Sequence, residues 1–577
     1  MSNRRFFILL MSLFALFAAM SCEKTYAPGD GEDTKKGYDG INEDDDDYTG
    51  NSSDTVFVVF KGSSVTSTNN AKASVSNSIV TIMSGGTFCL SGTLSGGQVI
   101  VNSSEKEDVR LVLKGASITC LNSSAIYIKD AQKVIIVTAA GTTNYLTDGS
   151  SYNYDDVINK EPDACIFSKS DLTLYGTGTL NVKGNFKNGI SGKDGVIIKS
   201  GTISVNSLNN GIRGKDYLLV YDGNITVTSG GDGLKSTNDT DKGAGFIWLK
   251  GGTFLLTSAT DAVSACTNLI IDYSNMTIKA GGGSGTNATT QGYDGTVSAK
   301  GLKASSKIEI NDGNISINSA DDAINCDTTF VMNGGTLNLS TMDDAVHSPK
   351  SLTINGGTIN VTKAYEGFEG AFINVNGGKT TLAVTDDAIN CSRGSATEYD
   401  DGSVVSVTGG TLILNSTGGD CFDSNGSAMM TGGTVVIQGP SSAPEVAIDV
   451  NGNFNINGGF LIASGPNSGN MIEGASNSSI QYSVVIKNSS SYFANTSLIH
   501  IQDGGNPDLV TFKPVRNASY LVFSSPGLTS GATYSLYTGG TYSVSTNTGG
   551  YYSGGNYSGG TFKTSFIVSS KASIISF

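Results

Sequence analysis

Residues 330–339 read Phe-Val-Met-Asn-Gly-Gly-Thr-Leu-Asn-Leu. Apolar residues alternate with other residues on both sides of the Asn-Gly-Gly turn, and this period of two is typical of β-strands. Glycines inside such a pattern mark a bend between two strands. The same kind of turn recurs at residues 355–357, 376–378, 408–410, 431–433 and 457–459. We therefore interpret the segment as one unit of a repeat built from short strands.

A second repeated phrase places a turn-forming or acidic residue before Gly or Ala and then a large apolar residue, which we call the anchor. The anchors are Ile190, Ile212, Leu234, Val263, Ile324, Val346, Phe368 and Ile389. Positions 190, 212 and 234 are 22 residues apart, and so are 302, 324, 346 and 368. A fixed period of this length indicates a solenoid, in which each repeat buries its core against its neighbours.

Three short strands fit into each repeat, and this predicts an all-β protein built as a parallel β-helix. A propeller or sandwich is the alternative, but a propeller blade needs about 40 residues linked by hairpins. The boundaries that we expect are residues 54–479 for the β-helix and residues 480–577 for a C-terminal β-rich capping region. The latter contains tyrosines separated by Gly-Gly pairs. Stacking on sugar rings is the alternative interpretation of these tyrosines.

Acidic residues occupy fixed positions around the anchors in the later repeats. Charges of this kind cannot face an apolar core, so we expect them to line an outer groove. Like charges about 5 Å apart repel by roughly 3 kcal/mol at an effective dielectric constant of 20. Turn formation explains a single Asp, but it does not call for adjacent acids in repeat after repeat.

The acidic groove predicts bound metal. Lys235, Lys300 and Lys303 flank the earlier repeats, but no lysine stands at the equivalent positions around residues 322–390. Oxygen-only clusters without a neighbouring His or Cys suit Ca²⁺. The predicted calcium ligands are Asp321, Asp322, Asp343, Asp344, Glu366, Glu369, Asp386, Asp387, Asp420 and Asp423.

The N-terminus predicts export and lipid anchoring. Arg4 and Arg5 precede an apolar run over residues 6–20, which is too short for a mature membrane-spanning helix. The run leads into Ala-Met-Ser-Cys22, which resembles a bacterial lipobox, so residues 1–21 are a predicted lipoprotein signal peptide and Cys22 the predicted lipidated residue. An ordinary signal with an incidental cysteine is the alternative. The expected location is the bacterial outer membrane or cell surface.

Residues 22–53 predict an acidic, disordered tether, because their polar composition cannot bury a core. The acidic run at residues 43–47 is interpreted as solvated charge.

The net charge of the whole chain is -15, which argues against nucleic acid as a partner. The seven cysteines other than Cys22 include no Cys-x-x-Cys motif, so we do not expect a zinc site. We expect buried free thiols, and a single disulfide is the alternative.

Several motifs resemble a known family. They are Ser168-Lys-Ser-Asp-Leu172, Gly176-Thr-Gly-Thr-Leu180, Asn188-Gly-Ile-Ser-Gly-Lys-Asp194, Asn210-Gly-Ile-Arg-Gly-Lys-Asp216, Tyr365-Glu-Gly-Phe-Glu369 and Gly419-Asp-Cys-Phe-Asp-Ser-Asn-Gly426. From about residue 80 onward the chain resembles the secreted β-helical carbohydrate-binding proteins of cellulolytic clostridia and Bacteroidetes, which are related in fold to family nine pectate lyases. The resemblance implies a right-handed β-helix, bound Ca²⁺ and affinity for plant polysaccharide such as polygalacturonate.

The resemblance also assigns part of the acidic set. Glu366 and Glu369 match a Glu-Gly-x-Glu motif. Asp420 and Asp423 match an Asp-Gly-x-Asp-x-Asn-Gly motif in which a cysteine here replaces the first glycine. Asp386 and Asp387 match an Asp-Asp-Gly-x-Asn element that here has alanine in place of glycine.

Three functions remain open at this point. The first is calcium-dependent binding of acidic, plant cell-wall polysaccharide by a monomeric surface lipoprotein. The second is a weak calcium-dependent pectate lyase, which needs a basic residue; its candidates are Arg213, Lys235, Lys303, Lys350 and Lys363. The third is a structural stalk or adhesin with structural calcium. Neither His347 nor His500 lies in a recognisable catalytic motif.

Overall fold

The structure is a computed structural model, which describes residues 40–49, 54–104, 107–154, 156–285, 292–293, 295–394, 399–489, 491–504, 508–543 and 546–577. The chain divides into the units Met1–Ile41 and Asn42–Phe577, and the second carries the fold described below. The predicted signal peptide, Cys22 and most of the predicted tether lie outside the described residues. Within the described ranges, no helix has the length and apolar character needed to cross a membrane.

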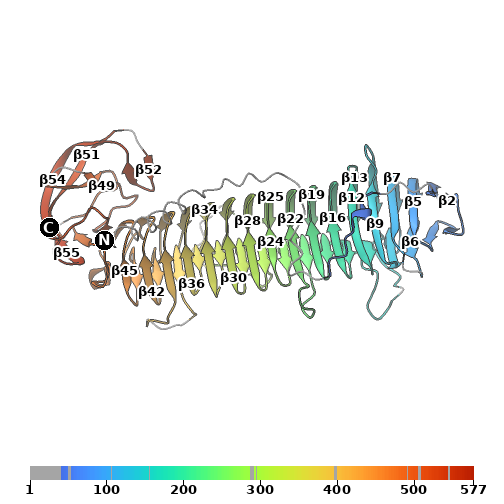
Figure 1. Ribbon diagram of the computed structural model, residues 1–577, viewed down its shortest axis with the longest axis horizontal. Coiled ribbons are helices and arrows are strands. Elements are labelled where there is room, and N and C mark those ends of the chain that lie inside the picture. Colours follow the sequence, from blue (N-terminus) through green and yellow to red (C-terminus); the bar gives the residue numbers. More distant parts are fainter. Residues whose placement is uncertain are drawn as a thin grey trace, which may run out of the picture. The chain divides into compact units, whose positions relative to one another are not determined.

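Successive coils of this unit pair strand by strand in parallel. One coil contains β26 (Leu302–Ala304), β27 (Lys307–Ile310) and β28 (Asn314–Ser319), and the next contains β29 (Ile324–Cys326), β30 (Thr329–Met332) and β31 (Thr336–Ser340). Each strand of the first coil pairs in parallel with its counterpart in the second. The coils follow one another in sequence order, as Figure 1 shows. This connectivity confirms the all-β prediction and agrees with a parallel β-helix; its handedness stays a prediction.

The candidate site lies on a sheet of sixteen strands, parallel except for its first pair. Its strands are β3 (Ala73–Ser76), β4 (Ile79–Ile82), β6 (Gln98–Asn102), β8 (Ile126–Asp130), β11 (Ala164–Ser168), β14 (Asn188–Gly192), β17 (Ile212–Gly214), β20 (Leu234–Ser236), β23 (Val263–Ala265), β26, β29, β32 (Val346–His347), β35 (Phe368–Glu369), β38 (Ile389–Cys391), β41 (Asp423–Ser424) and β44 (Asp449–Val450).

The other faces of the β-helix belong to a second, larger sheet with two parallel ladders. One ladder contains β9 (Lys133–Thr138), β12 (Asp171–Gly176), β15 (Gly195–Ile198), β18 (Tyr217–Val220), β21 (Phe246–Leu249), β24 (Leu269–Ile271), β27, β30, β33 (Ser351–Ile354), β36 (Phe372–Val375), β39 (Val404–Val407), β42 (Ser427–Met430) and β45 (Phe454–Ile456). The other contains β10 (Thr143–Thr147), β13 (Thr179–Gly184), β16 (Thr202–Ser207), β19 (Asn224–Ser229), β22 (Thr253–Ser258), β25 (Asn275–Ala280), β28, β31, β34 (Thr358–Lys363), β37 (Lys379–Val384), β40 (Thr411–Ser416), β43 (Thr434–Gln438) and β46 (Phe460–Gly465). The first strands of this sheet are β1 (Val56–Gly62), β2 (Ser64–Ser67), β5 (Gly86–Ser95) and β7 (Val109–Thr119).

The anchors form the core of the β-helix. Ile324, Val346 and Phe368 are fully buried, each in line with the anchor of the next coil. The bend before β31 needs glycine, because Gly335 has a φ of +82°, in the left-handed region. The seven cysteines among the described residues are free thiols, and only Cys266 is not buried. Interior packing of the thiols is thereby confirmed, and no disulfide joins them.

The acidic run after residue 42 is only partly solvated: Asp44, Asp45 and Asp46 are exposed as predicted, but Asp47 is buried, and for Asp47 the sequence prediction is wrong. The ammonium group of Lys133 contacts Asp44 and Asp47 at 2.8 Å each, and both Lys133 and Asp47 are buried. Lys199 and Tyr221 both bind the carboxylate of Glu43. The run includes the short 3-10 helix η1 (Asp45–Asp47). Lysines of the β-helix thus pair with Glu43, Asp44 and Asp47, which a charge count along the sequence does not show.

Beyond the last coil the pairing becomes antiparallel. β50 (Tyr520–Ser524) pairs antiparallel with β46 and with β47 (Ser483–Lys487), whereas β55 (Ala572–Ser576) pairs in parallel with β47. A separate sheet contains, in order, β52 (Thr546–Thr548), β53 (Tyr551–Ser553), β49 (Asp508–Phe512), β48 (Ile499–Asp503), β51 (Thr533–Tyr542) and β54 (Tyr557–Ile567). A second 3-10 helix, η2 (Gly469–Met471), precedes this region. The stabilising role of the region as a cap stays a prediction.

Candidate metal centre

Two columns of side chains follow the sixteen-stranded sheet from coil to coil. The turn column stands two residues before each anchor and contains Asp232, Asp261, Lys300, Asp322, Asp344, Glu366 and Asp387. Backbone hydrogen bonds fix its spacing. The N–H of Gly301 donates to the carbonyl of Asp322 at 3.1 Å, and that of Ala323 donates to the carbonyl of Asp344 at 2.9 Å. Adjacent members are therefore held on adjacent coils.

The outer ladder stands one residue after each anchor. Strand register aligns Arg213, Lys235, Ser264, Lys303, Asn325, His347, Glu369, Asn390, Asp423 and Asp449. In the three-residue strands this middle position is partly exposed while its two neighbours are buried. The ladder changes along the sheet from basic residues, through neutral ones, to acidic ones.

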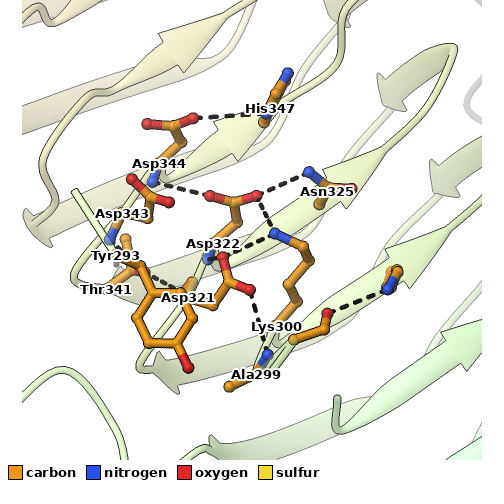
Figure 2. A network of polar contacts seen from close by, with 12 residues as sticks. Tyr293, Ala299, Lys300, Asp321, Asp322, Asn325, Thr341, Asp343, Asp344 and His347 are labelled. Atoms are coloured by element: carbon orange, nitrogen blue, oxygen red, sulfur yellow. Dashed lines mark hydrogen bonds and ion pairs between the residues drawn. The ribbon is translucent and has the colours of Figure 1, made fainter. Parts of the chain in front are cut away.

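In the earlier coils, which we call the lysine-paired coils, each column acid has a cationic partner. The ammonium group of Lys235 lies 2.5 Å from Asp232, and that of Lys303 lies 3.3 Å from Asp261. Lys300 contacts Asp321 at 2.8 Å and Asp322 at 2.7 Å, as Figure 2 shows. Lys300 itself occupies the turn column, between two acids. The positive charge that the sequence left unassigned at Asp321 and Asp322 is therefore supplied by this lysine.

In the later coils, which we call the acid-only coils, carboxylates converge on one another. Each of two groups offers three oxygens within 4.8 Å of one another: Asp344 with Glu366 and Glu369, and Asp420 with Asp423 and Asp449. Over the ranges that the structure describes, no Lys or Arg forms an ion pair with Asp344, Glu366, Asp387 or Asp420. His347 is the nearest base, with Nδ1 at 3.6 Å from Asp344 and 3.4 Å from Glu369.

This crowding changes the proton affinity of the acids. Burial and the charges of Asp322 and Glu366 raise the pKa of Asp344 well above its ordinary value. Burial and neighbouring carboxylates raise the pKa of Glu366 to about 7, of Asp420 to about 7 and of Asp387 to about 10. At neutral pH these acids need either protons or a cation, and carboxylate oxygens are the ligands that Ca²⁺ prefers.

The remaining predicted ligands lie beside these groups. Asp343 joins Asp321 and Asp322 in a third group within 4.8 Å, next to Lys300. Asp386 and Asp387 face the following coil at Gly419, where a Cβ atom would stand 2.2 Å and 2.3 Å from their Oδ1 atoms. The missing side chain of this glycine therefore leaves room for both carboxylates.

Sequence reasoning missed two members of the site. Asp449 follows the anchor-like Ile448, but the residue two positions before Ile448 is Val446 and not an acid, so the repeated phrase did not mark it. His347 was treated as a lone histidine, although it belongs to a group with Asp322 and Asp344. Aligning the residue after every anchor finds both.

Four of the five candidate lyase bases are engaged by other groups. Arg213 binds Asp163 at 3.2 Å, while Lys235 and Lys303 hold the column acids. Lys363 donates to the carbonyl of Ser284. A polar hollow of about 480 Å³ lies over the lysine-paired coils, lined in part by Lys235 and Lys303. Arg213, Lys235 and Lys303 are therefore held by acids and Lys363 by a backbone carbonyl. The fifth candidate, Lys350, is exposed.

Three similarities to known proteins accompany this geometry. A family model described as carbohydrate-binding domain-containing protein matches residues 76–345 and 339–565. A protein of the same description from Acetivibrio thermocellus is 41% identical over 225 residues, which are 39% of this chain and 79% of that protein. A solved structure titled "Structure of the polysaccharide lyase-like protein from C. thermocellum, Gadolinium derivative" is 36% identical and covers 40% of this chain and 92% of its own, with a TM-score of 0.39. Because the family model spans most of the sequence, the chain belongs to the family of carbohydrate-binding domain-containing proteins.

Proposed function

We propose that the protein binds acidic polysaccharide, such as polygalacturonate, through calcium held by the acid-only coils, and that it does so as a monomer. Family membership supports a carbohydrate ligand. The observation that carries the proposal is the convergence of Asp344, Glu366 and Glu369 within 4.8 Å, with no Lys or Arg ion pair to Asp344 or Glu366 among the described residues.

Local hydrogen bonds support a ligand role for these carboxylates. Nδ2 of Asn390 donates to Oε2 of Glu366 at 2.8 Å, and the N–H of Val446 donates to Oδ1 of Asp420 at 2.5 Å. Each bond fixes one oxygen of the carboxylate, and the other oxygen stays available to a cation. Such a donor set, rich in oxygen, suits a hard divalent cation such as Ca²⁺.

The net negative charge of the protein supports a requirement for calcium in the binding of an acidic polysaccharide. The chain has a net charge of -15, so an acidic polymer near the acid-only coils meets repulsion. When bound, calcium supplies positive charge that protein and sugar carboxylates can share. Asp344 and Glu366 hold and orient that charge at the surface of the sheet. Binding is therefore expected to require calcium and to be lost with a chelator.

Native electrophoresis in gels containing polygalacturonate tests this proposal. Retardation in Ca²⁺ that disappears with EDTA is the expected result, without new absorbance from unsaturated uronides. Growth of that absorbance would instead establish the lyase. Migration unchanged by polygalacturonate, together with a chelator-sensitive melting temperature, would contradict polysaccharide binding and leave calcium a structural role.

We also propose that Cys22 carries a lipid that anchors the protein at the outer membrane or cell surface. The apolar run over residues 6–20 and the lipobox-like residues before Cys22 support this proposal. Labelling of cells with a palmitate analogue is expected to mark the native protein and not Cys22→Ser. Equal labelling of both would contradict the anchor.

A further inference from the structure

The six-stranded C-terminal sheet (Figure 1) carries a row of five aligned residues, of which all but the threonine on β49 are aromatic. Register aligns Phe562, Tyr537, His500, Thr511 and Tyr552 on β54, β51, β48, β49 and β53. Directly paired residues of antiparallel strands point to the same face. The alternating residues, such as Ile501, Val510 and Leu536, are buried in the hydrophobic cluster behind the sheet. The aromatic row therefore lies on the face turned away from that cluster.

The sheet curls toward this aromatic face. Tyr542 of β51 contacts Tyr552 of β53 with ring centroids 5.6 Å apart, although β48 and β49 lie between these strands in the sheet. Tyr557 stacks on His500 at 3.9 Å and 12°. The rings thus line a curved surface and hold one another in place.

Part of this surface is open to solvent. The side chain of Phe562 is 54% exposed and meets Tyr537 edge-on at 5.7 Å. Tyr537, Tyr542 and Tyr552 are half-buried. A row of ordered, partly exposed rings is a surface whose contacts cost little conformational entropy on binding.

The polar groups beside the rings are an amide, hydroxyls and one carboxylate. The next row on the same face contains Gln502, Ser535 and Ser565. Gln502 donates to the hydroxyl of Tyr537 at 3.5 Å, and the hydroxyls of Ser535 and Ser565 lie 3.3 Å apart. Asp508 pairs with Gln502 in this second row and contacts His500 at 3.2 Å. The face therefore offers aromatic rings and hydroxyls, with no cation that would balance an acidic sugar in either row.

We propose that this curved aromatic face is a second carbohydrate-binding surface, specific for an uncharged polysaccharide and independent of metal. A sugar ring has an apolar C–H face and a rim of hydroxyls, which match the tyrosine rings and the Ser and Gln groups. The family model extends over this sheet to residue 565. The inference does not depend on the calcium proposal, because none of its residues belongs to the turn column or the outer ladder.

The test is affinity electrophoresis of the full-length protein in EDTA, in separate gels with hydroxyethylcellulose, xyloglucan and galactomannan. We expect retardation in at least one gel and an affinity about tenfold weaker for Phe562→Ser, as is usual for an aromatic residue at a binding hot spot. Phe57→Ser is the matched control, because Phe57 is 50% exposed in β1 and lies outside this sheet. This control should bind like the native protein, and equal melting temperatures check folding.

Several results would overturn the inference. Retardation in none of the three gels would do so, and so would equal weakening by both variants or a requirement for Ca²⁺. Sedimentation of the native protein as a dimer that Phe562→Ser dissociates would show that the face binds a second copy instead. Failure of calcium-dependent polygalacturonate binding leaves this test unaffected, so the two proposals fail separately.

Discussion

The lysine-paired coils and the acid-only coils use one backbone design with opposite electrostatics. In the former, Asp232, Asp261 and Asp322 each lie within ion-pair distance of a lysine. In the latter, Asp344 and Glu366 stand in the same column beside other carboxylates, which raise their pKa values together with burial. The same backbone therefore stacks equally well in coils where each column acid is paired with a lysine, so stacking does not explain why Asp344 and Glu366 lie beside other carboxylates. This difference is what the proposed calcium site requires of the acid-only coils.

The largest effect is expected from removing charge in the acid-only coils. In Asp344→Asn/Glu366→Gln, two charged oxygens that we assign to calcium are lost, so retention by polygalacturonate in Ca²⁺ should weaken by about 100-fold or more. Affinity electrophoresis measures this. The matched control is Asp232→Asn/Asp261→Asn in the lysine-paired coils, which should be retained nearly as strongly as the native protein. Equal losses in both variants would remove the distinction between the two regions.

Removing Lys300 should convert a lysine-paired coil into an acid-only one. Its ammonium group neutralises Asp321 and Asp322, so Lys300→Met in EDTA should lower the free energy of unfolding by about 2 kcal/mol. Calcium should restore much of this loss. Melting curves with and without Ca²⁺ measure both effects. Lys307→Met, which breaks a more exposed pair with Glu309, should change stability by less than about 0.5 kcal/mol. The same melting temperature of Lys300→Met with and without Ca²⁺ would contradict this prediction.

The reverse exchange adds a lysine to the acid-only coils. Asn390 lies on the outer ladder between Glu369 and Asp423, so the ammonium group in Asn390→Lys can reach neighbouring carboxylates, as Lys303 reaches Asp261. Calcium affinity should fall by about tenfold, because a resident cation competes for the same oxygens. Calcium titration measures this change. Ser264→Lys, the same change on the lysine-paired coils, should leave it unaltered.

The smallest effect is the pH dependence of stability without calcium. Raised folded-state pKa values mean that Glu366 and Asp420 stabilise the fold below their unfolded value of about 4. This contribution is lost as pH rises through about 7, the folded-state value. In EDTA the free energy of unfolding should therefore fall between about pH 4 and pH 7, by on the order of 1 kcal/mol per group, and the melting temperature should fall with it. Calcium should abolish the fall, and a melting temperature that rises with pH in EDTA would contradict the assignment.

The period of the anchors made much of the fold predictable. Ile324 and Phe368 are buried because a spacing of 22 residues returns each anchor to the same inward position. The adjacency of Asp344 and Glu366 followed from that spacing. Contacts between irregularly spaced segments did not follow from it. Lys300 comes after an insertion, and its reach to Asp321 depends on a register that the sequence does not display.

Long-range charge pairing was equally hidden. Lys133 binds Asp44 and Asp47, which precede it by 89 and 86 residues. Read alone, that acidic run has the composition of a solvated tether. Asp449 was missed for a different reason, since it lies 26 residues after Asp423 and lacks the acid-Gly phrase. Local composition and a single repeat length cannot supply these partners.

Calorimetric titration of Ca²⁺ into the chelator-treated, full-length protein tests the central claim most directly. The native protein and Asp232→Asn/Asp261→Asn should bind calcium with the same stoichiometry and affinity, whereas Asp344→Asn/Glu366→Gln should lose at least one site. In EDTA the latter variant should be at least as stable as the native protein, because it loses repulsion between carboxylates. Equal calcium binding by all three proteins, or none by the native protein, would contradict the account.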